Sequence, residues 1–267
     1  MKIISNYLFY VIIFLEVIFM RYLLLISVLP VIILLFLVYK LDKKKEPSKL
    51  LLSSFLWGAF ASIPIVIVEL ILQIFIPDIS ILHIFSIFIG VALVEEGFTW
   101  LVVKFKYKKD EFDETYDGIV YSVFVSLGFA LVENILYVCT NGMGTGVLRA
   151  LTAVPGHAYY GVIMGYYFGQ AKMAKTKKDS SKETGQLVLS ILIPVLFHGI
   201  YDVLLAENLL FVLLWFIFVI FVNVYSIRLL FKASKNNTKY IKGKYCRMCG
   251  TYVEDLNYCP ECGYKNE

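Results

Sequence analysis

The sequence contains few charged residues for its length, and this scarcity excludes an ordinary soluble domain. Only 17% of its 267 residues are Asp, Glu, Lys or Arg, whereas 59% are hydrophobic and the mean hydropathy is +0.74. Soluble globular domains contain about 25% charged residues. The chain is therefore predicted to be an integral membrane protein, with the lipid bilayer as its main environment. Its net charge of +4 arises from the loops between apolar segments, so we expect no nucleic-acid partner.

Charge is nearly absent from seven stretches of the chain, each close to the roughly 20 residues that a membrane-spanning helix needs. These stretches are residues 22–39, 51–75, 81–103, 116–138, 148–170, 186–206 and 209–231. The fold class predicted is therefore all-α, a polytopic transmembrane helix bundle of seven core spans within a domain at residues 21–232.

Lysine and arginine are also nearly absent from every second loop. The loops that follow the first, third and fifth spans, and the segment after the last, are rich in Lys, whereas the other three loops contain Arg149 alone. Because short cytoplasmic loops hold the excess of Lys and Arg, we expect the basic segments and the C-terminus to be cytoplasmic. The chain is predicted to be a multi-pass membrane protein.

Residues 1–20 form an apolar extension that lacks a small-residue signal cleavage site. Only Arg21 separates it from the first span, which leaves no polar turn between two antiparallel helices. Three interpretations stay open: an uncleaved signal-like segment, an eighth helix, or an extension upstream of a start at Met20.

Cysteine is rare, and four of the five cysteines lie near the C-terminus, after a basic linker at residues 233–244. Cys246 and Cys249 form one C-x-x-C pair, and Cys259 and Cys262 form another. Four thiolates in two such pairs suit a closed tetrahedral zinc site. A pair of disulfides is the alternative, which a cytoplasmic location disfavours. Residues 245–267 are therefore predicted to be a zinc ribbon with a structural zinc, and a protein partner for it stays open.

Six ionisable residues interrupt the apolar spans, although such groups are costly in lipid and usually face a bundle interior or a wet cavity. They are Glu95, Glu96, Glu133, His157, His198 and Asp202. Glu69 and His83 lie closer to span ends, and interfacial positions suffice for them. We therefore expect the six to converge on one pocket.

The spacing of these ionisable residues along the chain predicts which of them lie on the same face of a helix. His198 and Asp202 are four residues apart, so they share a helix face and can hydrogen-bond. Glu95 and Glu96 point about 100° apart around their helix, so one is expected in the pocket and the other beside a partner. Glu95 lies about 13 Å from Lys104, which places it near the membrane midplane. Peptide hydrolysis, metal binding and proton transport all remain compatible with these residue types.

Small residues form a stripe beside the first of these histidines. Gly161, Gly165 and Gly169 recur every four residues after His157. Such a stripe predicts close packing against a neighbouring helix.

Four segments of the chain, in order, resemble the PrsW intramembrane proteases, which are relatives of the CAAX prenyl proteases and the bacteriocin-immunity-type membrane proteases. The segments are "VEEGFTWLVV", "YDGIVYSVFVSLGFALVENILY", "RALTAVPGHAYYGVIMGYYFGQAK" and "LFHGIYDVLL". The resemblance implies a protease of a bacterial cell membrane that cleaves a membrane-anchored protein, such as an anti-sigma factor, near its extracytoplasmic side. It also implies catalytic roles for the six ionisable residues above and for Asn134, with a glutamate and a histidine activating water. Whether an active-site metal takes part stays open.

One position departs from the family pattern. The family commonly has a basic residue three positions after the second glutamate, where this chain has Thr99. The glutamate pair therefore needs another partner if the site is active. The leading hypothesis is a glutamate-dependent intramembrane protease. The alternatives are a non-enzymatic transporter or sensor that signals through the ribbon, and a protease of prenylated or lipid-modified peptides.

Overall fold

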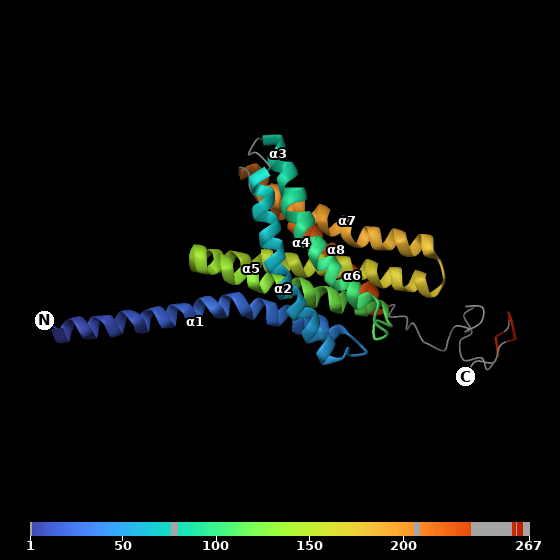
Figure 1. Ribbon diagram of the computed structural model, residues 1–267, viewed down its shortest axis with the longest axis horizontal. Coiled ribbons are helices and arrows are strands. Elements are labelled where there is room, and N and C mark those ends of the chain that lie inside the picture. Colours follow the sequence, from blue (N-terminus) through green and yellow to red (C-terminus); the bar gives the residue numbers. More distant parts are fainter. Residues whose placement is uncertain (1, 76–79, 206–208, 236–257, 260, 264–267) are drawn as a thin grey trace.

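The computed structural model describes residues 2–75, 80–205, 209–235, 258–259 and 261–263 of the chain. Its elements are helices (Figure 1). In chain order they are α1 (Lys2–Leu41), α2 (Ser48–Phe75), α3 (Ser80–Phe85), the π-helix η1 (Ser86–Ala92), α4 (Leu93–Tyr107), α5 (Thr115–Leu151), α6 (Ala153–Thr176), α7 (Ser180–Leu205) and α8 (Leu209–Lys235). The all-α class predicted from composition is thus observed in the part of the chain that the structure describes.

Six helical stretches in the described residues are long and apolar enough to cross a membrane. One of them, Thr115–Thr176, has 62 residues and would be about 93 Å long if straight, three times the roughly 30 Å of a bilayer core. The backbone reverses within this stretch at Gly142, whose φ of 81° suits a residue without Cβ. Helices α5 and α6 consequently pack beside each other as a helical hairpin (Figure 1).

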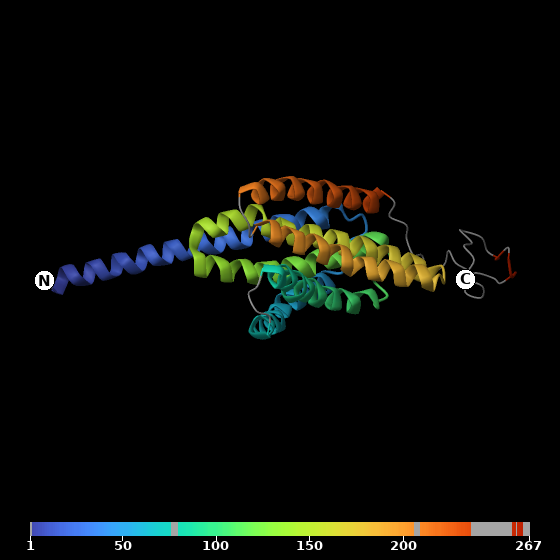
Figure 2. The same cartoon turned by 90° about the horizontal axis from the view of Figure 1, so that it is seen from above.

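Helix α1 includes the N-terminal extension without a break, since it runs from Lys2 to Leu41. Residues 2–20 are therefore the first part of this helix rather than a separate antiparallel eighth helix. This part projects beyond the bundle in Figure 2.

Helix α5 is the central element, and it packs against α1, α2, α4, α6 and α8. Its contact with α6 depends on glycine: a Cβ added at Gly165 would lie 2.3 Å from the carbonyl oxygen of Gly118. Another at Gly169 would lie 2.2 Å from the carbonyl oxygen of Thr115. The close helix packing predicted from the glycine stripe is thus confirmed, and α5 is its partner.

The described parts of the lysine-rich segments lie at one end of the bundle (Figure 1). Contacts join them: Lys44 donates to Asp113 at 2.7 Å, Tyr107 donates to Glu183 at 2.8 Å, and Ser234 donates to the carbonyl oxygen of Leu41 at 3.4 Å. The basic loops, which are every second loop along the chain, therefore lie together at the same end of the bundle. We call this the lysine end.

The predicted zinc ribbon is described only in small part. Cys246 and Cys249 lie outside the described residues, whereas Cys259 is buried and Cys262 is exposed. Gly263 has a φ of 71° and donates its backbone N–H to the carbonyl oxygen of Cys259 at 2.8 Å, which forms a tight turn around the second pair. The four-cysteine zinc site stays a prediction.

Candidate active site

A cavity of about 370 Å³ lies inside the bundle, away from the lysine end. Its lining comes from α3, η1, α4, α5, α6 and α7. Five of the residues singled out from the sequence line it: Glu95, Glu133, His157, His198 and Asp202. The helices that carry them are separated by up to about a hundred residues of chain, so the cavity is a product of the tertiary fold.

The two adjacent glutamates take different positions in this cavity. Glu95 lines it, whereas Glu96 lies outside the lining and is only 2% exposed. Both lie in the first turn of α4, which follows the seven-residue π-helix η1. A π-helix is a local widening of the helix that is often found at functional sites. The structure thus separates the two carboxylates as their angular spacing predicts.

His198 is surrounded by three carboxylates. Its Nδ1 lies 3.0 Å from Oε1 of Glu96, which is hydrogen-bonding distance. Its Nε2 lies 3.4 Å from Oδ2 of Asp202, four residues along α7, and 3.7 Å from Oε2 of Glu95. The contact with Asp202 is the one that the spacing predicts. Glu96 therefore holds one side of the imidazole while the other side faces two cavity carboxylates.

The second histidine belongs to a separate pair. Nε2 of His157 on α6 lies 2.9 Å from Oε2 of Glu133 on α5. The same Glu133 oxygen lies 2.7 Å from Nη2 of Arg149. The His157 and His198 rings pack edge to face with centroids 5.4 Å apart, and the ring of Tyr160 stacks on His198 at 5.0 Å. The two histidine pairs thus meet as one aromatic and ionisable cluster.

Asn134 takes a different place from the other predicted site residues. It is fully buried and does not line the cavity. Its side chain donates to the carbonyl oxygen of Ser27 on α1 at 3.3 Å and accepts from Nε of Arg149 at 3.3 Å. The structure therefore groups Asn134 with the support of Arg149 and with the attachment of α1 to α5.

The cavity lining also contains five titratable residues that the sequence does not assign to the site: His83, Tyr137, Arg149, Tyr160 and Tyr201. The sequence predicts only an interfacial position for His83, yet this residue belongs to the cavity lining. Arg149 had a usable signal, since it is the sole Lys or Arg in the loops assigned to the outer side. The three tyrosines carry no sequence signal that separates them from the other 16 tyrosines of the chain.

Thr99, where the family has a basic residue, is buried at 3% exposure. The partner of Glu96 in this chain is instead the imidazole of His198. A histidine from α7 thus occupies the position next to the carboxylate where a cation was expected from α4.

A divalent metal ion fits part of this cluster. One ligand atom from each of Glu95, Glu133 and His157 lies within 4.8 Å of the others. Two carboxylate oxygens and one imidazole nitrogen form a ligand set of the kind found in catalytic zinc sites, where three protein ligands leave one position open. In addition, Oε2 of Glu95 is buried without a hydrogen-bond partner among the described residues. The residues present therefore match the needs of a catalytic metal.

Comparisons with known proteins agree with this chemistry. Residues 46–226 match the profile of the family described as PrsW family intramembrane metalloprotease. A protein named Protease PrsW from Oceanobacillus iheyensis is 38% identical over 212 residues, which cover 79% of this chain and 95% of that relative. Proteins of the same name from Geobacillus kaustophilus and Bacillus subtilis are 43% and 37% identical over 184 and 182 residues. These alignments cover 68% and 67% of this chain, and 79% and 81% of the relatives. No solved structure matches the chain.

Proposed function

Because the chain belongs to the PrsW family of intramembrane metalloproteases, we propose that the cavity is its active site, where a peptide bond of a membrane-anchored protein is hydrolysed. The observation that carries the proposal is the convergence of Glu95, Glu133, His157 and His198 on one cavity inside the bundle. The chain is a protease, which excludes the alternative hypothesis of a non-enzymatic transporter or sensor.

Glu95, Glu133 and His157 would hold the metal, because their ligand atoms lie close enough together. A divalent cation bound there supplies Lewis-acid polarisation of the scissile carbonyl and activates water. Arg149 contacts Glu133 at 2.7 Å and holds that carboxylate in place. Because ligands are oriented by the groups behind them, Arg149 is a positioning residue in this scheme.

His198 is the group best placed to move protons. Glu96 contacts Nδ1 at 3.0 Å, so the carboxylate holds a proton on Nδ1 and leaves Nε2 as the ring atom that exchanges a proton with the cavity. Nε2 faces the cavity between Glu95 and Asp202. We assign to His198 removal of a proton from the attacking water and its delivery to the leaving amine. Glu96 and Asp202 position the imidazole.

Variants at Glu95 and His198 test these two roles separately. Glu95→Gln is expected to lose both cleavage and bound metal, because it removes a ligand charge. His198→Gln is expected to keep the metal and lose cleavage by a factor of roughly 10² to 10⁴, the usual contribution of general acid–base catalysis. Glu183→Gln, which changes a carboxylate near the lysine end, is the matched control. Unchanged cleavage in a folded Glu95→Gln variant would refute the assignment.

The substrate that we propose is a membrane-anchored protein of the anti-sigma-factor kind, following the family resemblance. Comparing membrane-protein fragments between cells with the wild type and cells with the Glu95→Gln variant would identify it. Accumulation of prenylated or lipid-modified peptides in the variant cells would instead support the alternative substrate class.

We also propose seven membrane crossings, with the lysine end in the cytoplasm and the cavity closer to the outer side. The reversal at Gly142 supports two crossings within Thr115–Thr176, and the shared position of the lysine-rich segments supports their common side. Reporter fusions after Lys109 and after Lys178 should both report the cytoplasm. A fusion in the region of Gly142 should report the opposite side.

For the C-terminal tail we propose a structural zinc held by Cys246, Cys249, Cys259 and Cys262. The spacing of the two pairs supports this, as does the tight turn at Gly263. A partner protein for the ribbon would be sought by crosslinking from the tail in intact cells.

A further inference from the structure

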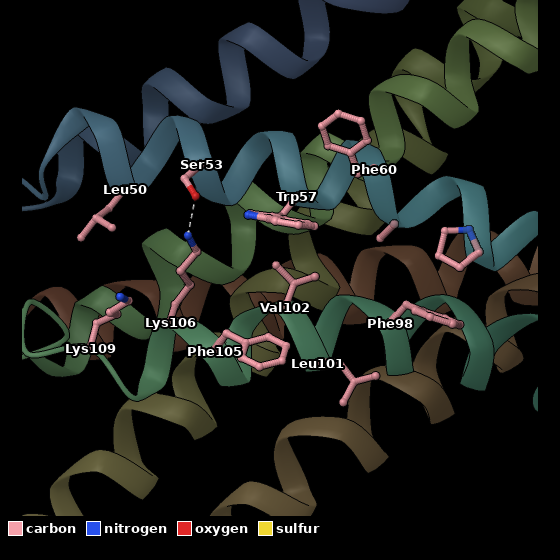
Figure 3. Close-up of a pocket in the computed structure, with 12 residues that line it drawn as sticks. Leu50, Ser53, Trp57, Phe60, Phe98, Leu101, Val102, Phe105, Lys106 and Lys109 are labelled. Carbon is pink, nitrogen blue, oxygen red and sulfur yellow. Dashed lines mark hydrogen bonds between the residues drawn. The ribbon is translucent and has the colours of Figure 1, made fainter.

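An apolar groove of about 760 Å³ lies between α2 and α4 (Figure 3). Aromatic and aliphatic side chains form most of it, among them Trp57, Phe60, Phe98, Leu101 and Phe105. Several of these are largely exposed, with Trp57 at 60% and Phe105 at 66%. The groove volume is within the roughly 300–1,000 Å³ of ligand pockets in general.

One end of this groove is polar and cationic. Lys106 and Lys109 of α4 and the following turn lie there, with Ser53 of α2 opposite them (Figure 3). The ammonium of Lys106 donates to Oγ of Ser53 at 2.8 Å, although the residue is only 7% exposed. In the part of the chain that the structure describes, no carboxylate forms an ion pair with Lys106 or Lys109. A nearly buried cation that donates to a neutral hydroxyl lacks the counter-charge that such groups normally have.

The geometry points to a binding site for an anionic phospholipid, with its phosphate at Lys106 and Lys109 and an acyl chain along the aromatic wall. The groove follows α2 from Leu50 to Pro64, which is about 21 Å of helix. One leaflet of the bilayer core is about 15 Å thick, half of the whole. The groove is therefore long enough for one lipid tail and leaves its cationic end at the depth of a headgroup. Basic pockets between helices on the cytoplasmic side are a known form of anionic lipid site.

Charge complementarity decides against a transmembrane helix of a substrate as the occupant. This step relies on the orientation proposed above, in which the lysine end is cytoplasmic. Membrane proteins carry Lys and Arg at the cytoplasmic ends of their helices, and such residues would meet Lys106 and Lys109 with like charge. A lipid phosphate at the same depth has the opposite charge. The groove also shares no lining residue with the catalytic cavity.

Native mass spectrometry of the full-length protein, with added phosphatidylglycerol or phosphatidylcholine, tests the proposal. We expect phosphatidylglycerol to bind with clear preference. Lys106→Ala/Lys109→Ala should weaken this binding about thirtyfold, since each lysine near a membrane surface contributes about fivefold. Val102→Trp, which fills the groove, should weaken the binding of both lipids.

The matched control is Lys104→Ala/Lys175→Ala, which removes two lysines of the same end that contact Trp100 and Tyr107 rather than the groove. Lys106→Arg should keep the preference and show that a charge is required. Thermal unfolding of each variant in phosphatidylcholine shows whether it is folded. Equal binding of the two lipids, equal losses in the control and groove variants, or displacement of phosphatidylglycerol by an added transmembrane peptide would each overturn the proposal. None of these readouts depends on proteolysis, so the result stands apart from the catalytic assignment.

Discussion

Replacing Gly165 by Ala tests whether the contact between α5 and α6 holds the active site together. A Cβ at this position would lie 2.3 Å from the carbonyl oxygen of Gly118, and 2.5 Å from its carbonyl carbon and from Cα of Ile119. All three are backbone atoms, so no side chain can rotate away. The helices would have to separate by about 1 Å before these atoms reach ordinary van der Waals distances.

The expected change in the free energy of unfolding of Gly165→Ala follows from two opposing effects. Overpacking of a close-packed interior costs about 1–3 kcal/mol, whereas Ala is favoured over Gly inside a helix by about 1 kcal/mol. Because the clash involves backbone on both sides, we expect the upper part of the first range and a net loss of about 2 kcal/mol. The separation would also reach the site, since Glu133 on α5 and His157 on α6 are only 2.9 Å apart. Bound metal should therefore decrease together with stability.

Unfolding of the purified protein in detergent, followed by intrinsic fluorescence, measures the first effect, and metal content measures the second. Gly185→Ala is the control, because it lies within α7 and nothing is found within 4 Å of an added Cβ. The control should be unchanged or slightly more stable. If Gly165→Ala behaves like Gly185→Ala in both assays, the packing argument is wrong.

Three further predictions concern separate parts of the molecule. Arg149→Gln should weaken metal binding by about tenfold to a hundredfold, because Glu133 loses the guanidinium that orients it. Arg149→Lys keeps the positive charge and should weaken metal binding less. Equal metal affinity of the wild type and both variants in titrations would contradict this prediction. At the lysine end, burial raises the pKa of Glu46 from 4.5 to about 7, so the folded state binds this proton more tightly than the unfolded state. The contribution of Glu46 to the free energy of unfolding is therefore full below about pH 4.5 and is lost as the pH rises through about 7. Glu46→Gln can still accept the hydrogen bond from Tyr121, so it should reduce the change in the free energy of unfolding between these pH values. An unchanged pH dependence in the variant would refute the prediction. Replacing the four cysteines of the tail by Ser should lower the zinc content by one ion per chain while the cavity metal and proteolysis remain, and unchanged zinc content would exclude the ribbon.

The sequence by itself determined the class of the protein and the residues with chemical potential. Long apolar stretches can satisfy their backbone groups in lipid only as helices, so composition decided the all-α fold. Ionisable residues are too costly in lipid to be there without a role, so their presence alone pointed to Glu95, Glu133, His157 and His198. Local spacing was equally informative, since the contact of His198 with Asp202 and the glycine stripe of α6 follow from the geometry of one helix.

Only the tertiary structure decided which of these groups face each other. The pairing of Glu96 with His198 joins residues 102 positions apart, and it depends on how α4 and α7 are rotated about their axes. The contact between Arg149 and Glu133 also depends on the tertiary structure, because the chain reverses at Gly142 and brings the two residues together. Helices in lipid are apolar on all sides, so their sequences carry little information about which face meets which neighbour. That information lies in the packing of side chains between helices, which placed His83 in the cavity lining and Asn134 outside it.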